Sequence, residues 1–260
     1  MINEKPKKLV RPLKIIFLNL TLISICSFLL VSFILFAVKQ YKRVTELGTT
    51  GPFIIIVICA ISLLAFLGYL MPYFLWRLYP SLYFYDDGFR VNKGPLLSYQ
   101  NLEYFFGPVK GHVNRFMFIW YKDEDGEWQK IPAMGYSERS FDGFQRDFVE
   151  ATYPKAMEAL AAGQELKFRF KDPKKNINSL SKKRMFEKLE VAAMTIKVTK
   201  DSISVDDEVY DFDQFQVGYE LGCLKIWDKT GKLILILSNQ ALIHRVNLLA
   251  ALVSSLGGQS

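Results

Sequence analysis

The chain has 260 residues, of which half are apolar and 15% aromatic, and it carries a formal net charge of +7. The excess is confined to the first 80 residues, with nine Lys or Arg and two Asp or Glu, whereas the rest of the chain holds 24 of each sign. A nucleic-acid-binding domain concentrates basic charge on the folded surface that contacts phosphate. This charge distribution therefore argues against a nucleic-acid partner.

Two apolar runs, residues 15–38 and 52–77, predict transmembrane helices, because about 20 such residues cross a hydrocarbon core of roughly 30 Å. Backbone groups in lipid must be satisfied within the segment, so we expect a helical hairpin with a short outside loop at 39–51. A cleaved signal peptide has a shorter apolar stretch and a small-residue cleavage site. Core helices of a soluble protein are not apolar on every face.

The flanking charges predict the orientation of this hairpin. The arm formed by residues 1–14 holds five Lys or Arg and the loop holds three, so the positive-inside rule places both termini in the cytoplasm. No charge lies in the middle of either run, which argues against a transporter or channel. The polar side chains of the first run have two interpretations: they bond across to the second helix, or, as we favour for each, they bond within their own helix. They are Asn19, Ser24, Ser27 and Ser32.

Beyond residue 80 the pattern changes to short strands separated by turns and followed by a helix, and this order occurs twice. The first unit is predicted at residues 81–166 and the second at 189–260. Each is expected to have an opening hairpin, a longer strand, a strand pair around an acidic glycine turn, and a closing helix. The matched pieces are the strands 98–106 and 209–219, the segments 98–102 and 209–213, Trp120 and Trp227, and the helices 138–162 and 239–256.

In this element order the chain resembles bacterial pleckstrin-homology-like (PH-like) membrane proteins with an N-terminal two-helix transmembrane hairpin. The resemblance implies a membrane-anchored α+β protein of the bacterial inner membrane, in which the hairpin precedes two PH-like β-barrel modules, each closed by a C-terminal helix. Phosphoinositide-binding members carry a basic cluster in the first hairpin. Here the turns are Asp86-Asp87-Gly88 and Lys200-Asp201-Ser202, so no inositol-phosphate site is predicted.

The predicted linker, residues 167–188, holds nine basic and two acidic side chains between units of net charge −4 and −3. Two interpretations are open. A basic segment is attracted to an anionic inner leaflet by about 1 kcal/mol per residue, or it is a solvated connector whose charge keeps it extended. The residues proposed for membrane-surface contact are Lys174, Lys175, Lys182, Lys183 and Arg184.

Aromatic residues near one predicted strand end, Tyr104, Phe105 and Phe106, have two interpretations. Strand edges with aromatic anchors dock peptides, which would make this a partner-binding edge. Alternatively, small barrels fill their interiors with aromatic side chains.

No pattern in the chain indicates catalysis. The two histidines, His112 and His244, have no metal-ligand spacing, the three cysteines form no zinc or disulfide pattern, and phosphate-binding and nucleophile motifs are absent. We therefore predict a non-enzyme without cofactors that presents its modules to the cytoplasm. The expected partners are the bilayer, anionic lipid headgroups and a protein not identified by the sequence. The alternative is an immunity protein that neutralises a toxin by direct binding.

Overall fold

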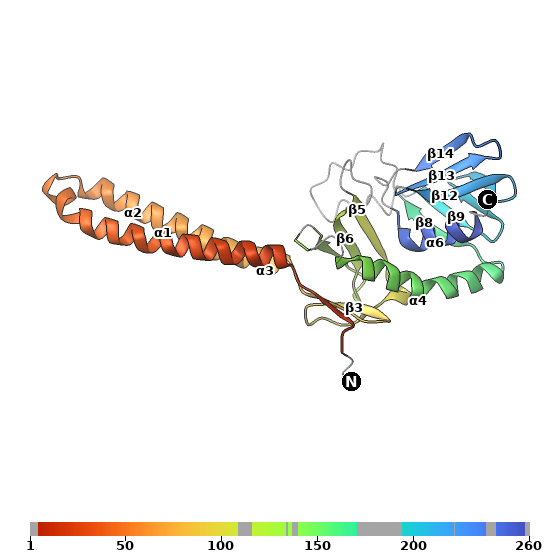
Figure 1. The fold of residues 1–260 in the computed structure, drawn as a ribbon, viewed down its shortest axis with the longest axis horizontal. Helices are drawn as coiled ribbons and strands as arrows, with labels where there is room; N and C mark the ends of the chain where they lie inside the picture. Colours follow the sequence, from red (N-terminus) through yellow and green to blue (C-terminus); the bar gives the residue numbers. More distant parts are fainter. Residues whose placement is uncertain are drawn as a thin grey trace. The chain divides into compact units, whose positions relative to one another are not determined.

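The computed structural model describes residues 5–108, 116–133, 135–136, 140–170, 194–220, 222–237 and 243–257. It is an α+β protein in which two long apolar helices precede most of the antiparallel sheets (Figure 1). The chain forms two compact units. One comprises Arg11–Ser81 with Gly135–Ser137, and the other comprises Met1–Val10, Leu82–Met134 and Glu138–Ser260.

The first of these units is a helical hairpin. Its legs are α1 (Leu13–Glu46) and a continuous helix made of α2 (Thr50–Ala65), the π-helical turn η1 (Phe66–Leu70) and α3 (Met71–Leu78). Both legs are long and apolar enough to cross a membrane, and only 11% and 6% of their most apolar windows are buried, unlike core helices of a soluble protein. The turn between the legs occupies residues 47–49, and α1 continues into the predicted outside loop at 39–51 because the Lys, Arg and Glu residues after the first apolar run are good helix formers.

Polar side chains connect the two legs. The Asn19 amide nitrogen donates a 3.1 Å hydrogen bond to the Pro72 carbonyl, and the Ser27 and Tyr69 hydroxyls lie 2.9 Å apart. The expectation that these side chains bond within their own helix is therefore wrong for Asn19 and Ser27. The π-helical turn and a proline, which has no N–H for the helical ladder, interrupt the regular backbone where these contacts form.

In its described residues the second unit forms four antiparallel sheets and two helices. The first half has one sheet in the order β1-β2-β3-β4, a sheet in the order β5-β6-β7 and a following helix. The elements are β1 (Lys8–Val10), β2 (Leu82–Phe84), β3 (Gly88–Val91), β4 (Leu97–Ser98), the 3-10 turn η2 (Tyr99–Asn101), β5 (Tyr104–Pro108), β6 (Phe116–Lys122), β7 (Trp128–Pro132) and α4 (Asp142–Ala161). We call these elements the first module.

The second half repeats this arrangement as the second module, with sheets in the orders β11-β10-β9-β8 and β12-β13-β14. Its elements are β8 (Leu166–Phe170), β9 (Met194–Val198), β10 (Ser202–Val205), β11 (Glu208–Asp211), β12 (Phe215–Glu220), β13 (Cys223–Asp228), β14 (Leu233–Leu237) and α6 (Val246–Leu256). Each module thus has a four-stranded sheet, a three-stranded sheet and a closing helix. The described strands do not form a closed barrel.

Matched backbone hydrogen bonds establish the repeat at the level of individual turns. Three bonds of the first module have counterparts of nearly equal length in the second. They are Tyr85 N–H to Gly88 O (2.8 Å) and Thr199 N–H to Ser202 O (2.9 Å), Tyr99 N–H to Asp87 O and Phe212 N–H to Asp201 O (both 2.9 Å), and Asp123 N–H to Glu127 O and Asp228 N–H to Lys232 O (both 3.0 Å). The two halves of this unit therefore share their sheet order and their turn geometry.

These bonds also correct the details of the sequence alignment. The turn aspartates Asp123 and Asp228 occupy equivalent positions, so the residue that aligns with Trp227 is Lys122 and not Trp120. The predicted long strands 98–106 and 209–219 are each broken by a turn, at 99–101 and 212–214.

The module boundaries differ from the prediction at both starts. The basic arm contributes β1, whose Leu9 pairs with Tyr83 of β2, and the predicted linker begins with most of β8, whose Phe168 pairs with Ile196 of β9. The helical hairpin is consequently inserted between the first and second strands of the first module. Residues 171–193 occupy the corresponding chain position in the second.

The closing helices begin later than predicted, at Asp142 and Val246. They cover cores of different composition. In the first module Phe144 has ring contacts at 5.3–6.3 Å with six aromatic side chains: Phe84, Phe89, Tyr99, Tyr104, Phe106 and Phe148. The second core is mainly aliphatic, with fully buried Ile196, Val217, Leu224, Leu249 and Leu252, and β8 adds two buried aromatic side chains, Phe168 and Phe170.

Candidate functional site

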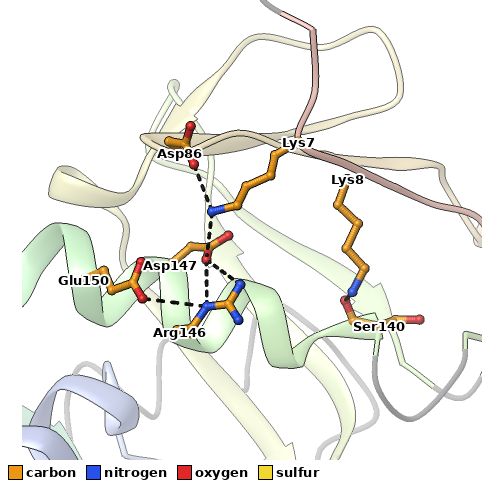
Figure 2. Close-up of polar contacts among 7 residues, drawn as sticks. All are labelled: Lys7, Lys8, Asp86, Ser140, Arg146, Asp147 and Glu150. Carbon is orange, nitrogen blue, oxygen red and sulfur yellow. Dashed lines mark hydrogen bonds and ion pairs between the residues drawn. The ribbon is translucent and has the colours of Figure 1, made fainter.

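The N-terminal arm is attached to the first module by side chains as well as by strand pairing. The Lys7 ammonium lies 2.9 Å from a carboxylate oxygen of Asp86 and 3.5 Å from one of Asp147 (Figure 2). On the next residue, Lys8 donates a 3.4 Å hydrogen bond to the Ser140 carbonyl. We call the group formed by Lys7, Asp86, Arg146 and Asp147 the N-terminal latch.

Asp147 is the buried member of this latch. Its side chain is 4% exposed, and α4 brings it beside Arg146, whose Nη2 lies 3.2 Å from the carboxylate. Arg146 also approaches Glu150 at 3.7 Å on the exposed helix surface (Figure 2). Because a buried carboxylate is unfavourable without compensation, Asp147 needs the cations that the arm and the helix supply. The Asp86 hydrogen bond and the charge of Asp147 in turn raise the pKa of Lys7.

Two depressions adjoin the latch. One of about 470 Å³ is lined by Lys5, Lys7, Tyr85, Asp86 and Asp87. The other, of about 310 Å³, is lined by Lys7, Lys8, Phe84, Asp142, Gly143, Arg146 and Asp147. Charges of both signs line each depression, and Lys7 and Arg146 are already paired with carboxylates. The arrangement holds the arm in place and offers no concentrated charge of one sign to a ligand.

A second polar group joins the two modules. Residues 243–245, which precede α6, form bridges to Phe105 of β5 and Phe170 of β8. The His244 N–H donates to the Arg169 carbonyl at 2.8 Å, and the Arg245 N–H donates to the Tyr104 carbonyl at 3.1 Å. One segment of the second module therefore connects a strand of the first module with the first strand of its own. We call this the inter-module joint.

Side chains reinforce the inter-module joint around Glu103. One carboxylate oxygen lies 3.0 Å from Arg169 and 3.9 Å from both Lys122 and His244. His244 is 5% exposed, and burial together with the positive charges of Arg245, Arg169 and Lys122 lowers its pKa to about 3. His244 is consequently neutral at pH 7, without the near-neutral pKa that suits a general base.

Of the predicted site residues, the structure describes the three aromatic ones. Tyr104 and Phe105 are 0% and 3% exposed, as the interior interpretation expects, and Phe106 is half-buried. Lys174, Lys175, Lys182, Lys183, Arg184 and His112 lie outside the described residues.

Sequence reasoning missed both the latch and the joint. A charged residue at 147, on the helix face shared by Phe144 and Phe148, was the available signal for a buried ion pair. The contact of Glu103 with Arg169 joins residues 66 positions apart and had no local signal.

Within the described ranges, no group of three or more His, Cys, Asp or Glu side chains is placed to hold a metal ion. Comparisons with protein-family models, curated proteins and solved structures give no match to this chain.

Proposed function

We propose that this chain is a non-catalytic integral protein of the bacterial inner membrane, whose hairpin anchors two PH-like modules in the cytoplasm. There the modules bind a protein partner or the membrane surface. The observation that carries the proposal is the pairing of β1 with β2, because these strands flank the hairpin on either side in the sequence.

The pairing supports an anchor that enters and leaves the membrane on one face. β1 ends at Val10 and α1 begins at Leu13, while α3 ends at Leu78 and β2 begins at Leu82. The two strands are antiparallel neighbours, so both ends of the hairpin belong on the same side of a bilayer. The five basic residues of the arm favour the cytoplasmic side.

The module architecture supports the PH-like part of the proposal. A four-stranded sheet, a three-stranded sheet and a closing helix occur in this order in both modules, and the family resemblance likewise implies strands followed by a closing C-terminal helix. The fold alone does not determine a ligand. The binding role is favoured because the charged groups of the latch and the joint hold chain segments together.

Two measurements on whole cells test this proposal. A membrane-impermeant maleimide is expected to label a cysteine at Leu47 in the hairpin turn of intact cells, and to label one at Val209 of β11 only after lysis; both positions are exposed. Reversed labelling would contradict the orientation. Photo-crosslinkers at exposed module positions are then expected to capture a protein or a lipid, whereas one in the hairpin turn is the control.

The absence of adducts at every module position would contradict a binding role. If a captured protein is toxic to cells that lack this chain, the result would favour the immunity-protein alternative over a general scaffold.

A further inference from the structure

The last strand of the second module has an unusual surface. β14 consists of five aliphatic residues, and Leu233, Ile234 and Ile236 are 44%, 44% and 50% exposed. Among the described strands it pairs only with β13, so it is an edge strand. Edge strands in soluble proteins are commonly protected by charged residues or proline. The equivalent strand β7 has both, as Lys130 and Pro132.

An irregularity in the strand pairing increases this exposure. Ile226 pairs with Leu235 and Trp227 pairs with Leu233, so two residues of β14 oppose one of β13. A bulge of this kind redirects a side chain, and Leu233 and Ile234 are consecutive exposed residues instead of alternating. Trp227 lies beside them over Gly218, where an added Cβ would be 3.2 Å from the ring. We call Trp227, Leu233, Ile234 and Ile236 the β14 surface.

Lysines lie next to the β14 surface, on β13 and in the turn that joins β13 to β14. Residues 189–260 contain only six basic side chains, and three of them, Lys225, Lys229 and Lys232, belong to the β13–β14 hairpin. Lys229 and Lys232 are exposed. The Lys225 ammonium lies 5.7 Å from the centre of the Trp227 ring and 3.1 Å from a carboxylate oxygen of Glu220, so the basic character of this surface comes mainly from Lys229 and Lys232. The carboxylate of the turn residue Asp228 accepts hydrogen bonds from the N–H groups of Thr230 and Lys232, both at 2.9 Å.

The rest of the second module has the opposite charge. Six of the nine acidic residues in 189–260 lie between Asp201 and Asp213. They surround Val209 of β11, which at 61% is more exposed than any residue of β14. The module therefore offers one exposed apolar strand in a basic setting and one exposed apolar side chain in an acidic setting.

We infer that the β14 surface docks on the anionic leaflet of a lipid bilayer. Exposed aliphatic side chains beside a half-buried indole and bordered by lysines complement an interface of acyl chains beneath anionic headgroups. The inference depends on the proposed membrane anchor, which keeps the surface within reach of a bilayer and so raises its effective concentration there. Strand addition by a second copy is disfavoured, because the bulge interrupts the regular edge that a new strand would need.

The test uses the full chain in vesicles, with the native cysteines Cys26, Cys59 and Cys223 replaced and an environment-sensitive dye on a single cysteine at Ile236. Addition of phosphatidylglycerol to phosphatidylcholine vesicles is expected to shift the dye emission to the blue. The same dye at Val209 is the matched control and is expected not to respond. Lys229→Gln with Lys232→Gln is expected to weaken docking about thirtyfold, from about fivefold per lysine.

Each outcome distinguishes docking from its alternatives. A dye at Ile236 that ignores anionic lipid, or responds as the dye at Val209 does, would overturn the inference. An emission shift that depends on the protein-to-lipid ratio at constant lipid composition would assign the β14 surface to a second copy. Flotation of the same samples with the vesicles reports the membrane anchor separately, so its failure is distinguishable from a failure of docking.

Discussion

The two modules have the same strand order, matched turns and a closing helix, yet they differ in core composition, first connection and exposed edge. The first has an aromatic core, a helical hairpin between its first two strands and an edge strand with lysine and proline. The second has a mainly aliphatic core, in which Phe168 and Phe170 of β8 are the fully buried rings, and an apolar edge strand. The connection between the first two strands of a module therefore tolerates a large insertion. In the first module the end of β1 and the start of β2 are neighbours in the sheet, so a hairpin can leave and return at the same place.

This insertion has a structural consequence for the first module. More than 70 residues separate its first strand, β1, from the strands that follow it. The first strand of the second module, β8, instead follows α4 after a short connection. The N-terminal latch supplies the additional contacts that keep β1 in place, and the inter-module joint then ties the two modules together.

The largest expected effects come from the contrasting cores. Phe144→Ala removes the ring at the centre of the aromatic core and is expected to lower the free energy of unfolding by about 3–5 kcal/mol. Leu249→Ala in the aliphatic core should cost about 2–5 kcal/mol. Thermal unfolding of the full chain measures both, with the exposed Glu158→Gln on α4 as a control. If Phe144→Ala behaved like the control, the aromatic core would not be the centre of the first module.

Acidification is expected to destabilise the folded chain through His244 of the inter-module joint. The pKa of His244 is lowered from 6.5 to about 3, so between these values the unfolded chain binds a proton that the folded chain does not. Stability should therefore fall by up to about 1.4 kcal/mol per pH unit as the pH drops below 6.5. Melting temperatures at pH 7 and 4.5 should differ less for His244→Gln than for the wild type. Equal pH dependence in both proteins would show that His244 is not held neutral.

In the helical hairpin, which is inserted in the chain between β1 and β2 of the first module, Gly68 lies close to Cys26. A Cβ at position 68 would lie 2.6 Å from the Cys26 Cβ, so Gly68→Ala is expected to destabilise helix packing by about 1–3 kcal/mol. Addition of Cys26→Gly should restore most of the loss, because it frees the space that the new methyl group needs. Unfolding by SDS in mild detergent measures both proteins, and a double variant no more stable than Gly68→Ala would contradict this packing.

The smallest expected effect concerns the N-terminal latch. Asp147→Asn keeps the side chain's shape but removes its pairing with Lys7 and Arg146, and is expected to cost about 1–2 kcal/mol, since both cations are partly solvated. Glu150→Gln breaks only an exposed pair and should cost less than about 0.5 kcal/mol. Limited proteolysis of the arm should be faster in Asp147→Asn alone. Equal rates of proteolysis in the two variants would contradict the claim that Asp147 holds the N-terminal arm on the first module.

The sequence predicted the hairpin and the twofold repeat because both depend on patterns that many residues share: long uncharged runs and regularly spaced turns. It did not predict β1, since three residues in a basic arm have too little alternation to identify a strand. The alternation of Leu166, Phe168 and Phe170 in β8 was present but was masked by the basic residues between them. The latch and the joint depend on contacts between distant residues, such as Lys7 with Asp147, which no local pattern encodes.

The most direct test of the account is whether the N-terminal arm forms the first strand of the first module. Leu9 and Tyr83 are paired across β1 and β2, and paired residues in an antiparallel sheet lie within disulfide distance. In a chain without its native cysteines, Leu9→Cys with Tyr83→Cys is expected to form an intramolecular disulfide on mild oxidation in native membranes, whereas Leu9→Cys with Val209→Cys is not. Absence of that disulfide, or equal formation in the control pair, would contradict the insertion of the hairpin into the first module.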